Sequence, residues 1–181
     1  DEDLAKQFIS SNISVLMGGG RDYFNKRRDH LNLIDSLKEN NYVVIDSITE
    51  DIPSDTEKLI NFCAPTNPLS KIEGRGDFLP LAAKKAVTVL NTNNKNGFFL
   101  MIEGSQIDWG GHQNDSEYII SETLDFDNTI KKMLDFAEKD NHTLVLITAD
   151  HETGGYGITG GNIDDKTLET SFLTDQHTAT M

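Results

Sequence analysis

The chain has 181 residues, of which 36% are hydrophobic and 25% are charged, and its formal net charge is −14. This length and balance are typical of one soluble, globular domain and argue against an intrinsically disordered chain. The negative charge argues against a nucleic-acid-binding surface, and no apolar run approaches the roughly 20 residues that a membrane-spanning helix needs.

The first part of the chain alternates short helix and strand patterns. Residues 3–11 predict an amphipathic helix, and the apolar run 13–17, which is followed by three glycines, predicts a buried strand and a loop. A second helix is predicted over 31–39 and a second strand over 42–45. Residues 47–78 hold most of the prolines and predict loops with short elements.

Two later apolar runs predict the central strands. Pro80 suits the first turn of a helix that reaches about residue 90. Residues 98–102 and 143–149 are continuously apolar, as in parallel strands covered on both faces. Between them, 117–139 has apolar residues at helical spacing, namely Ile120, Leu124, Ile130, Met133, Leu134 and Ala137. This strand–helix–strand order predicts an α/β fold with a mostly parallel sheet flanked by helices on both faces.

Acidic residues and histidines follow both of these predicted strands. Glu103, Asp108 and His112 come after the first, and Asp150 and His151 come after the second. Ligands of α/β proteins gather at the carboxyl ends of parallel strands, and carboxylate and imidazole are standard zinc ligands. Each residue alone has an ordinary reading as a capping acid, a turn residue or a surface histidine. Their coincidence at two strand ends predicts a metal site.

The sequence alone does not decide the local backbone conformation of these residues. Asp108 and His112 are four residues apart, so they would share one side of a helical turn, but the two glycines between them also allow a tight loop. Asp150 and His151 would need a turn beyond the strand end to reach one ion. A catalytic zinc usually has three protein ligands, and His177 is a candidate for the third.

These motifs resemble the alkaline phosphatase family. The segment 102–108 (IEGSQID) with His112 resembles the family's first metal motif, Thr148-Ala149-Asp150-His151 its second, and His177-Thr178 its late His-Thr motif. The resemblance covers nearly the whole chain. The first motif is specific to the family, whereas the Asp-His pair is shared with phosphomutases, sulfatases and nucleotide pyrophosphatases.

The resemblance implies a role for each residue. Asp108, His112 and His177 would bind one zinc ion, and Asp150 and His151 would bind a second. Glu103 would bind a third ion, usually magnesium. Two zinc ions can hold the entering and leaving oxygens during phosphoryl transfer. Phosphate monoesters are the implied substrates, and the family is typically periplasmic or secreted. Trp109 lies beside the first motif, where the family varies.

The resemblance also implies that 1–181 is a single-domain fragment of a larger catalytic domain. The family's nucleophilic serine and phosphate-binding arginine are expected upstream of this chain, and a further strand after His177-Thr178. No catalytic residue is therefore predicted within it, and we expect the polypeptide alone to be inactive. An exposed sheet edge would favour self-association, for instance as a homodimer.

Two alternative functions differ in class. One is another enzyme of the same metal-dependent superfamily, such as a phosphomutase or a phosphodiesterase. Glu103 argues for the monoesterases, because a ligand for a third metal at that spacing marks them. The other is a non-catalytic metal-binding domain that keeps the fold.

Overall fold

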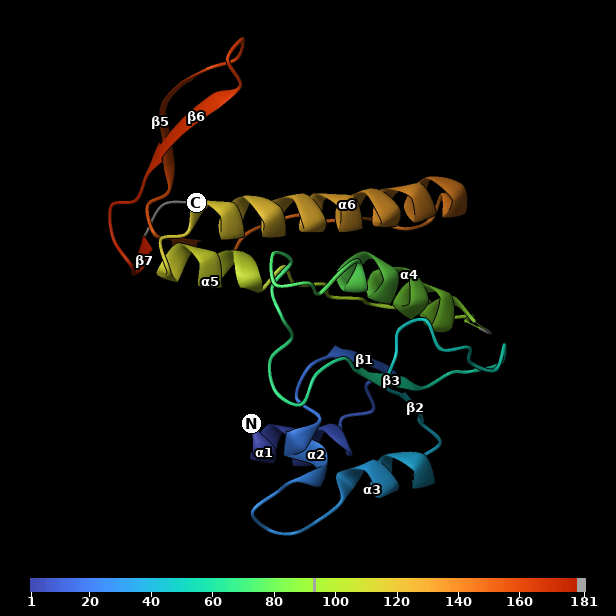
Figure 1. The fold of residues 1–181 in the computed structure, drawn as a ribbon. Helices are drawn as coiled ribbons and strands as arrows, with labels where there is room; N and C mark the ends of the chain where they lie inside the picture. The colour runs from blue at the N-terminus through green and yellow to red at the C-terminus, as the bar shows by residue number, and fades with distance from the viewer. Residues whose placement is uncertain (93, 179–181) are drawn as a thin grey trace. The chain divides into compact units, whose positions relative to one another are not determined.

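The computed structural model describes residues 1–92 and 94–178, which form two compact units (Figure 1). Among the described residues, the first unit comprises Asp1–Leu69 and the part of 75–102 that is described, and the second comprises Ser70–Gly74 and Glu103–Thr178. No helix in the described part of the chain has both the length and the apolar character needed to cross a membrane. The prediction of a single domain over 1–181 stays a prediction.

The first unit is a parallel sheet with helices on both faces. Its strands lie in the order β1-β3-β2, and β3 pairs in parallel with both neighbours. The elements are α1 (Glu2–Phe8), β1 (Val15–Gly18), α2 (Asp22–Asn25), α3 (Leu33–Glu39), β2 (Val43–Ile45), β3 (Leu59–Phe62) and α4 (Phe78–Asn91). In Figure 1, α1, α2 and α3 lie on one face of this sheet and α4 lies on the other.

The alternation of side chains along β3 explains the two covered faces. Ile60 and Phe62 pack with the residues of α1–α3, where Leu37 is completely buried. Leu59 points to the opposite face and packs with Val89 of α4. Successive side chains in a strand point to opposite faces, so a strand covered on both sides is apolar at nearly every position.

The second unit contains two packed helices and two antiparallel strand pairs. Its elements are α5 (Gln106–His112), α6 (Ser116–Asp140), β4 (Glu152–Thr153), β5 (Gly157–Asn162), β6 (Thr167–Ser171) and β7 (His177–Thr178). Strand β4 pairs with β7, and β5 pairs with β6 as a hairpin. The Asp115 side chain caps α6 by accepting a hydrogen bond from the Tyr118 N–H.

The buried face of α6 is mixed, which corrects the predicted apolar face: Tyr118 and Ile119 are buried together with three polar residues, Glu122, Asp125 and Thr129. Glu122 and Asp125 are buried, whereas Leu124 is 64% exposed and Leu134 is 48% exposed. Lys71 donates its backbone N–H to Glu122 Oε1 at 2.7 Å and its ammonium to Asp125 Oδ1 at 2.8 Å. Buried carboxylates need such partners, and Lys71 supplies one to each of them.

The strands predicted at 98–102 and 143–149 are wrong for the described structure. Neither segment forms a strand, and several of their apolar side chains are exposed: Phe99 by 88%, Leu144 by 80% and Leu146 by 81%. A strand forms only where a neighbour satisfies its backbone N–H and C=O groups. The parallel sheet consists instead of β1, β2 and β3, and β3 lies in the proline-rich region where only short elements were expected.

Candidate metal centre

Helix α5 settles the local conformation of the first motif. Because Asp108 and His112 lie one helical turn apart, their side chains share one face, and Asp108 Oδ1 lies 3.5 Å from His112 Nε2. The glycines between them allow close packing. A Cβ atom on Gly110 would lie 2.8 Å from Ile119 Cγ1 of α6, and one on Gly111 would lie 2.6 Å from the Thr153 backbone oxygen of β4.

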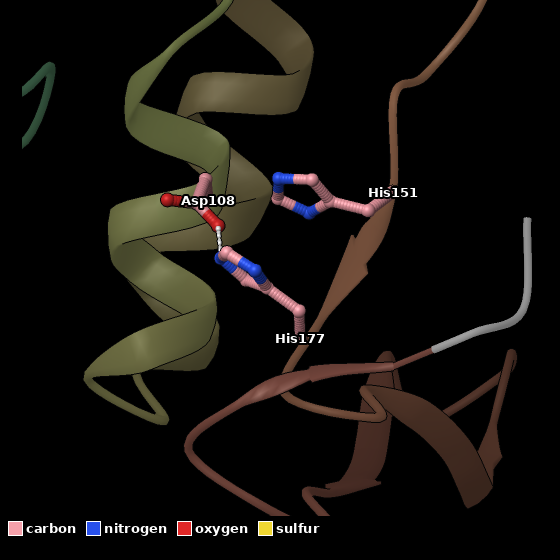
Figure 2. A group of neighbouring side chains, drawn as sticks. All are labelled: Asp108, His151 and His177. Atoms are coloured by element: carbon pink, nitrogen blue, oxygen red, sulfur yellow. Dashed lines mark ion pairs between the residues drawn. The ribbon is translucent and has the colours of Figure 1, made fainter.

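The short strands β4 and β7 bring two distant histidines together. In their antiparallel pairing, Thr153 is opposite His177 and Glu152 is opposite Thr178. His151 directly precedes β4, and its ring stacks on the His177 ring with centroids 3.9 Å apart. Figure 2 shows His151 and His177 reaching from the strand side toward Asp108 on α5.

The donor atoms of the first predicted zinc set converge. His177 Nε2 lies 3.5 Å from Asp108 Oδ1 and 3.0 Å from His112 Nε2. His151 joins the group, since ligand atoms of Asp108, His151 and His177 all lie within 4.8 Å of one another. We call Asp108, His112, His151 and His177 the His-Asp cluster.

A backbone contact orients His112. The Nδ1 atom of His112 lies 2.6 Å from the carbonyl oxygen of Asp175, in the loop before β7. A carbonyl only accepts hydrogen bonds, so Nδ1 carries the proton, and in a neutral ring Nε2 keeps its lone pair. That lone pair faces His177 Nε2 and Asp108 Oδ1. Such a convergence of nitrogen and carboxylate donors fits a zinc ion.

The second predicted zinc pair is also close, but more open. Asp150 Oδ2 lies 3.4 Å from His151 Nε2, and Asp150 Oδ1 accepts a hydrogen bond from the His151 N–H. The Asp150 side chain is 88% exposed. Residue 150 lies at a bend two residues before β4, so the pair precedes a strand and does not follow the predicted strand over 143–149.

Glu103 is not a member of the group of potential metal ligands found among the described residues. It is exposed in the irregular segment before α5, and that group contains Asp108, His151 and His177. Trp109 follows Asp108 on α5 and is 36% exposed. The assignment of Glu103 as a magnesium ligand therefore stays a prediction.

Sequence reasoning missed Glu152, which ties β4 to β7. Its Oε2 atom accepts hydrogen bonds from the Thr178 hydroxyl and the Gly155 N–H, and its Oε1 atom accepts from the Tyr156 N–H. Burial alone would raise the pKa of Glu152, but these hydrogen bonds outweigh it and lower the pKa. The position of Glu152 directly after Asp-His was the available signal.

The comparisons with known proteins point to alkaline phosphatases. The family model "Alkaline phosphatase" matches residues 1–180. Alkaline phosphatase 3 of Bacillus subtilis (strain 168) is 42% identical over 147 residues, which cover 81% of this chain and 31% of that protein. The repressible alkaline phosphatase of Saccharomyces cerevisiae is 31% identical over 172 residues, which cover 79% of this chain and 30% of that protein.

Comparison of the fold with solved structures also points to alkaline phosphatases. The alkaline phosphatase from the Antarctic bacterium TAB5 superposes with a TM-score of 0.89 and 36% sequence identity, over 99% of this chain and 54% of that one. The chain thus spans about a third of the length of the two curated relatives and about half of the TAB5 enzyme. On the match of family model, sequence and fold, the chain belongs to the alkaline phosphatase family.

Proposed function

We propose that this chain supplies the metal-binding part of a phosphomonoester hydrolase that depends on zinc and magnesium. The observation that carries the proposal is the approach of His112 Nε2, His177 Nε2 and Asp108 Oδ1 to within 3.5 Å of one another, from two elements far apart in sequence. Family membership favours phosphate monoesters over the substrates of phosphomutases and phosphodiesterases.

Each residue has a proposed task. Asp108, His112 and His177 hold one zinc ion, Asp150 and His151 hold the second, and Glu103 contributes to a magnesium site. When bound, the ions supply positive charge for the phosphate and Lewis-acid stabilisation of its attacking and leaving oxygens. The proposed magnesium site is supported by a similar solved structure, a TAB5 alkaline phosphatase mutant described with Mg bound.

Other parts of the protein position the proposed metal ligands. Helix α5 fixes the Asp108 carboxylate, and the Asp175 carbonyl orients the His112 ring. The nucleophilic serine and the phosphate-binding arginine are proposed to come from sequence upstream of this chain, so the 181-residue polypeptide alone is expected not to turn over substrate. A periplasmic or secreted location is proposed from the family resemblance, and a homodimer is proposed from the exposed sheet edge expected of a fragment.

Zinc titration of the metal-free chain by calorimetry tests the proposal. We expect at least one site of micromolar or tighter affinity, and we expect His177→Ala to weaken it by about tenfold or more, because one of three protein ligands is lost. His142→Ala is the matched control, since His142 is exposed and its Nδ1 contacts the Asp140 carbonyl, away from the cluster. Equal affinities in the two variants would refute the assignment of His177.

A further inference from the structure

A threonine connects the two proposed zinc sites. Thr153 of β4 is buried, although it lies beside exposed and half-exposed ligands. Its hydroxyl oxygen lies 2.5 Å from Asp108 Oδ1 and 3.2 Å from His151 Nδ1. Asp108 belongs to the first proposed zinc set and His151 to the second, so one hydroxyl group touches a member of each.

The hydroxyl group has a single proton, and its two neighbours compete for it. An ionised carboxylate can only accept, so the short contact to Asp108 Oδ1 takes the Thr153 proton. The Thr153 oxygen can then only accept from the ring of His151. The 3.2 Å contact therefore requires a proton on His151 Nδ1.

This proton fixes the metal-binding face of His151. With Nδ1 protonated, the neutral ring has its lone pair on Nε2, and Nε2 is the atom that lies 3.4 Å from Asp150 Oδ2. The resulting geometry parallels that of His112, where the Asp175 carbonyl takes the place of the hydroxyl. In metal sites, a hydrogen bond to the second ring nitrogen commonly fixes the tautomer in this way.

We propose that Thr153 is a positioning residue, which couples Asp108 to His151 and sets the Nδ1–H tautomer of His151, so that Nε2 is presented to a metal ion. This inference rests on the proposed function for its purpose. The tautomer itself is a property of the metal-free protein and does not depend on zinc binding.

Long-range ¹H–¹⁵N NMR of ¹⁵N-histidine-labelled, metal-free protein at a pH where the rings are neutral tests the proposal. The His151 signals are identified by their loss in His151→Asn. We expect the Nδ1–H tautomer in the wild type and in Thr153→Ser, and a shift toward the Nε2–H tautomer in the nearly isosteric Thr153→Val. His112 is the internal control, because its carbonyl contact is unchanged and its tautomer should persist in every variant.

Zinc titration provides the second readout. We expect Thr153→Val to lose about 10- to 100-fold in zinc affinity, and Thr153→Ser to restore it, because loss of such an outer hydrogen bond typically has that effect. An Nε2–H tautomer of His151 in the wild type would overturn the proposal even if Thr153→Val failed to fold. Conversely, wild-type protein with the Nδ1–H tautomer but without zinc affinity would refute the proposed function and leave this inference standing.

Discussion

Buried Arg27 and its partner Asp29 illustrate how single residues stabilise the first unit. The guanidinium group donates to both Asp29 carboxylate oxygens, at 2.9 and 2.6 Å, and to the backbone oxygens of Glu2 and Tyr23. The hydrogen bonds from Arg27 lower the pKa of Asp29 from 3.8 to about 2. The pair joins α1 to the segment after α2, in a contact that hydrophobic patterns do not predict.

The lowered pKa of Asp29 predicts an acid-sensitive contribution to stability. Because the folded state binds this proton less readily than the unfolded state, the contribution is complete above pH 4 and disappears as the pH falls toward 2. We expect Asp29→Asn to lower the melting temperature at pH 7 and to lessen its fall between pH 4 and 2, as followed by circular dichroism. Asp55→Asn, at an exposed acid of the same unit, serves as the control. Identical acid profiles for Asp29→Asn and wild type would contradict this role.

Much of the candidate site was predictable at the residue scale. Asp108, His112, Asp150, His151 and His177 were all identified from motif and spacing, and the structure places them as neighbours in two overlapping groups. Their metal binding stays a prediction. The outer contacts from Thr153, Glu152 and the Asp175 carbonyl were not predictable, because they depend on the pairing of two-residue strands that have no hydrophobic signal.

The packing of α5 against β4 depends on glycine. Gly111 brings the helix so close that an added Cβ atom would lie 2.6 Å from the Thr153 backbone oxygen, far inside van der Waals contact. The same helix places Asp108 Oδ1 2.5 Å from the Thr153 hydroxyl oxygen. From the sequence, Gly110 and Gly111 were compatible with either a helix or a loop. In the structure they lie in helix α5, where the close packing of α6 and β4 leaves no room for a side chain.

We expect Gly111→Ala to separate α5 from β4. Overpacking of this kind typically costs about 1–3 kcal/mol in unfolding free energy, and it should also weaken zinc binding by moving Asp108 and His112 away from His177. Gly157→Ala is the matched control in the same unit, because a Cβ atom there would meet no atom within 4 Å. Chemical denaturation and zinc titration of both variants measure the effect. Wild-type zinc affinity in Gly111→Ala would show that the close approach is dispensable.

The helices and strands were predictable where the local pattern of apolar residues alone indicates the element. The predicted helices match α1, α3, α4 and α6, and the predicted strands match β1 and β2, each with at least one end shifted. Strand β3 falls in the region 47–78, where only loops and unspecified short elements were predicted because of its prolines, although Leu59–Phe62 is fully buried. Residues 98–102 and 143–149 have the composition of strands, but composition cannot reveal whether a pairing partner is present.

At the scale of the whole molecule, the absence of a strand over 143–149 leaves apolar side chains exposed to solvent. In residues 143–149 of the second unit, Leu144, Leu146 and Ile147 are 80%, 81% and 59% exposed. Large exposed apolar side chains in an extended segment mark an interaction or aggregation site, because the backbone also offers unpaired hydrogen-bonding groups. This feature gives a physical basis for the self-association expected from the sequence.

We expect the chain to self-associate with rising concentration, and we expect Leu144→Lys with Leu146→Lys to reduce that association, since charge on an exposed strand-like segment opposes pairing. Multi-angle light scattering over a concentration series measures it. Leu4→Lys is the control for added charge alone, because Leu4 is 66% exposed on α1 of the other unit. A wild-type chain that stays monomeric throughout the series would contradict the prediction.

The most direct test of the proposed function is to determine the location of the zinc ion that the chain binds. Anomalous X-ray scattering at the zinc edge, from crystals of the zinc-loaded chain, measures it without reference to activity. We predict a peak about 2.0–2.2 Å from Asp108, His112 and His177, within the usual range for zinc bonded to oxygen and nitrogen. Zinc bound elsewhere, with His112 Nε2 and His177 Nε2 both outside bonding distance, would contradict the proposal.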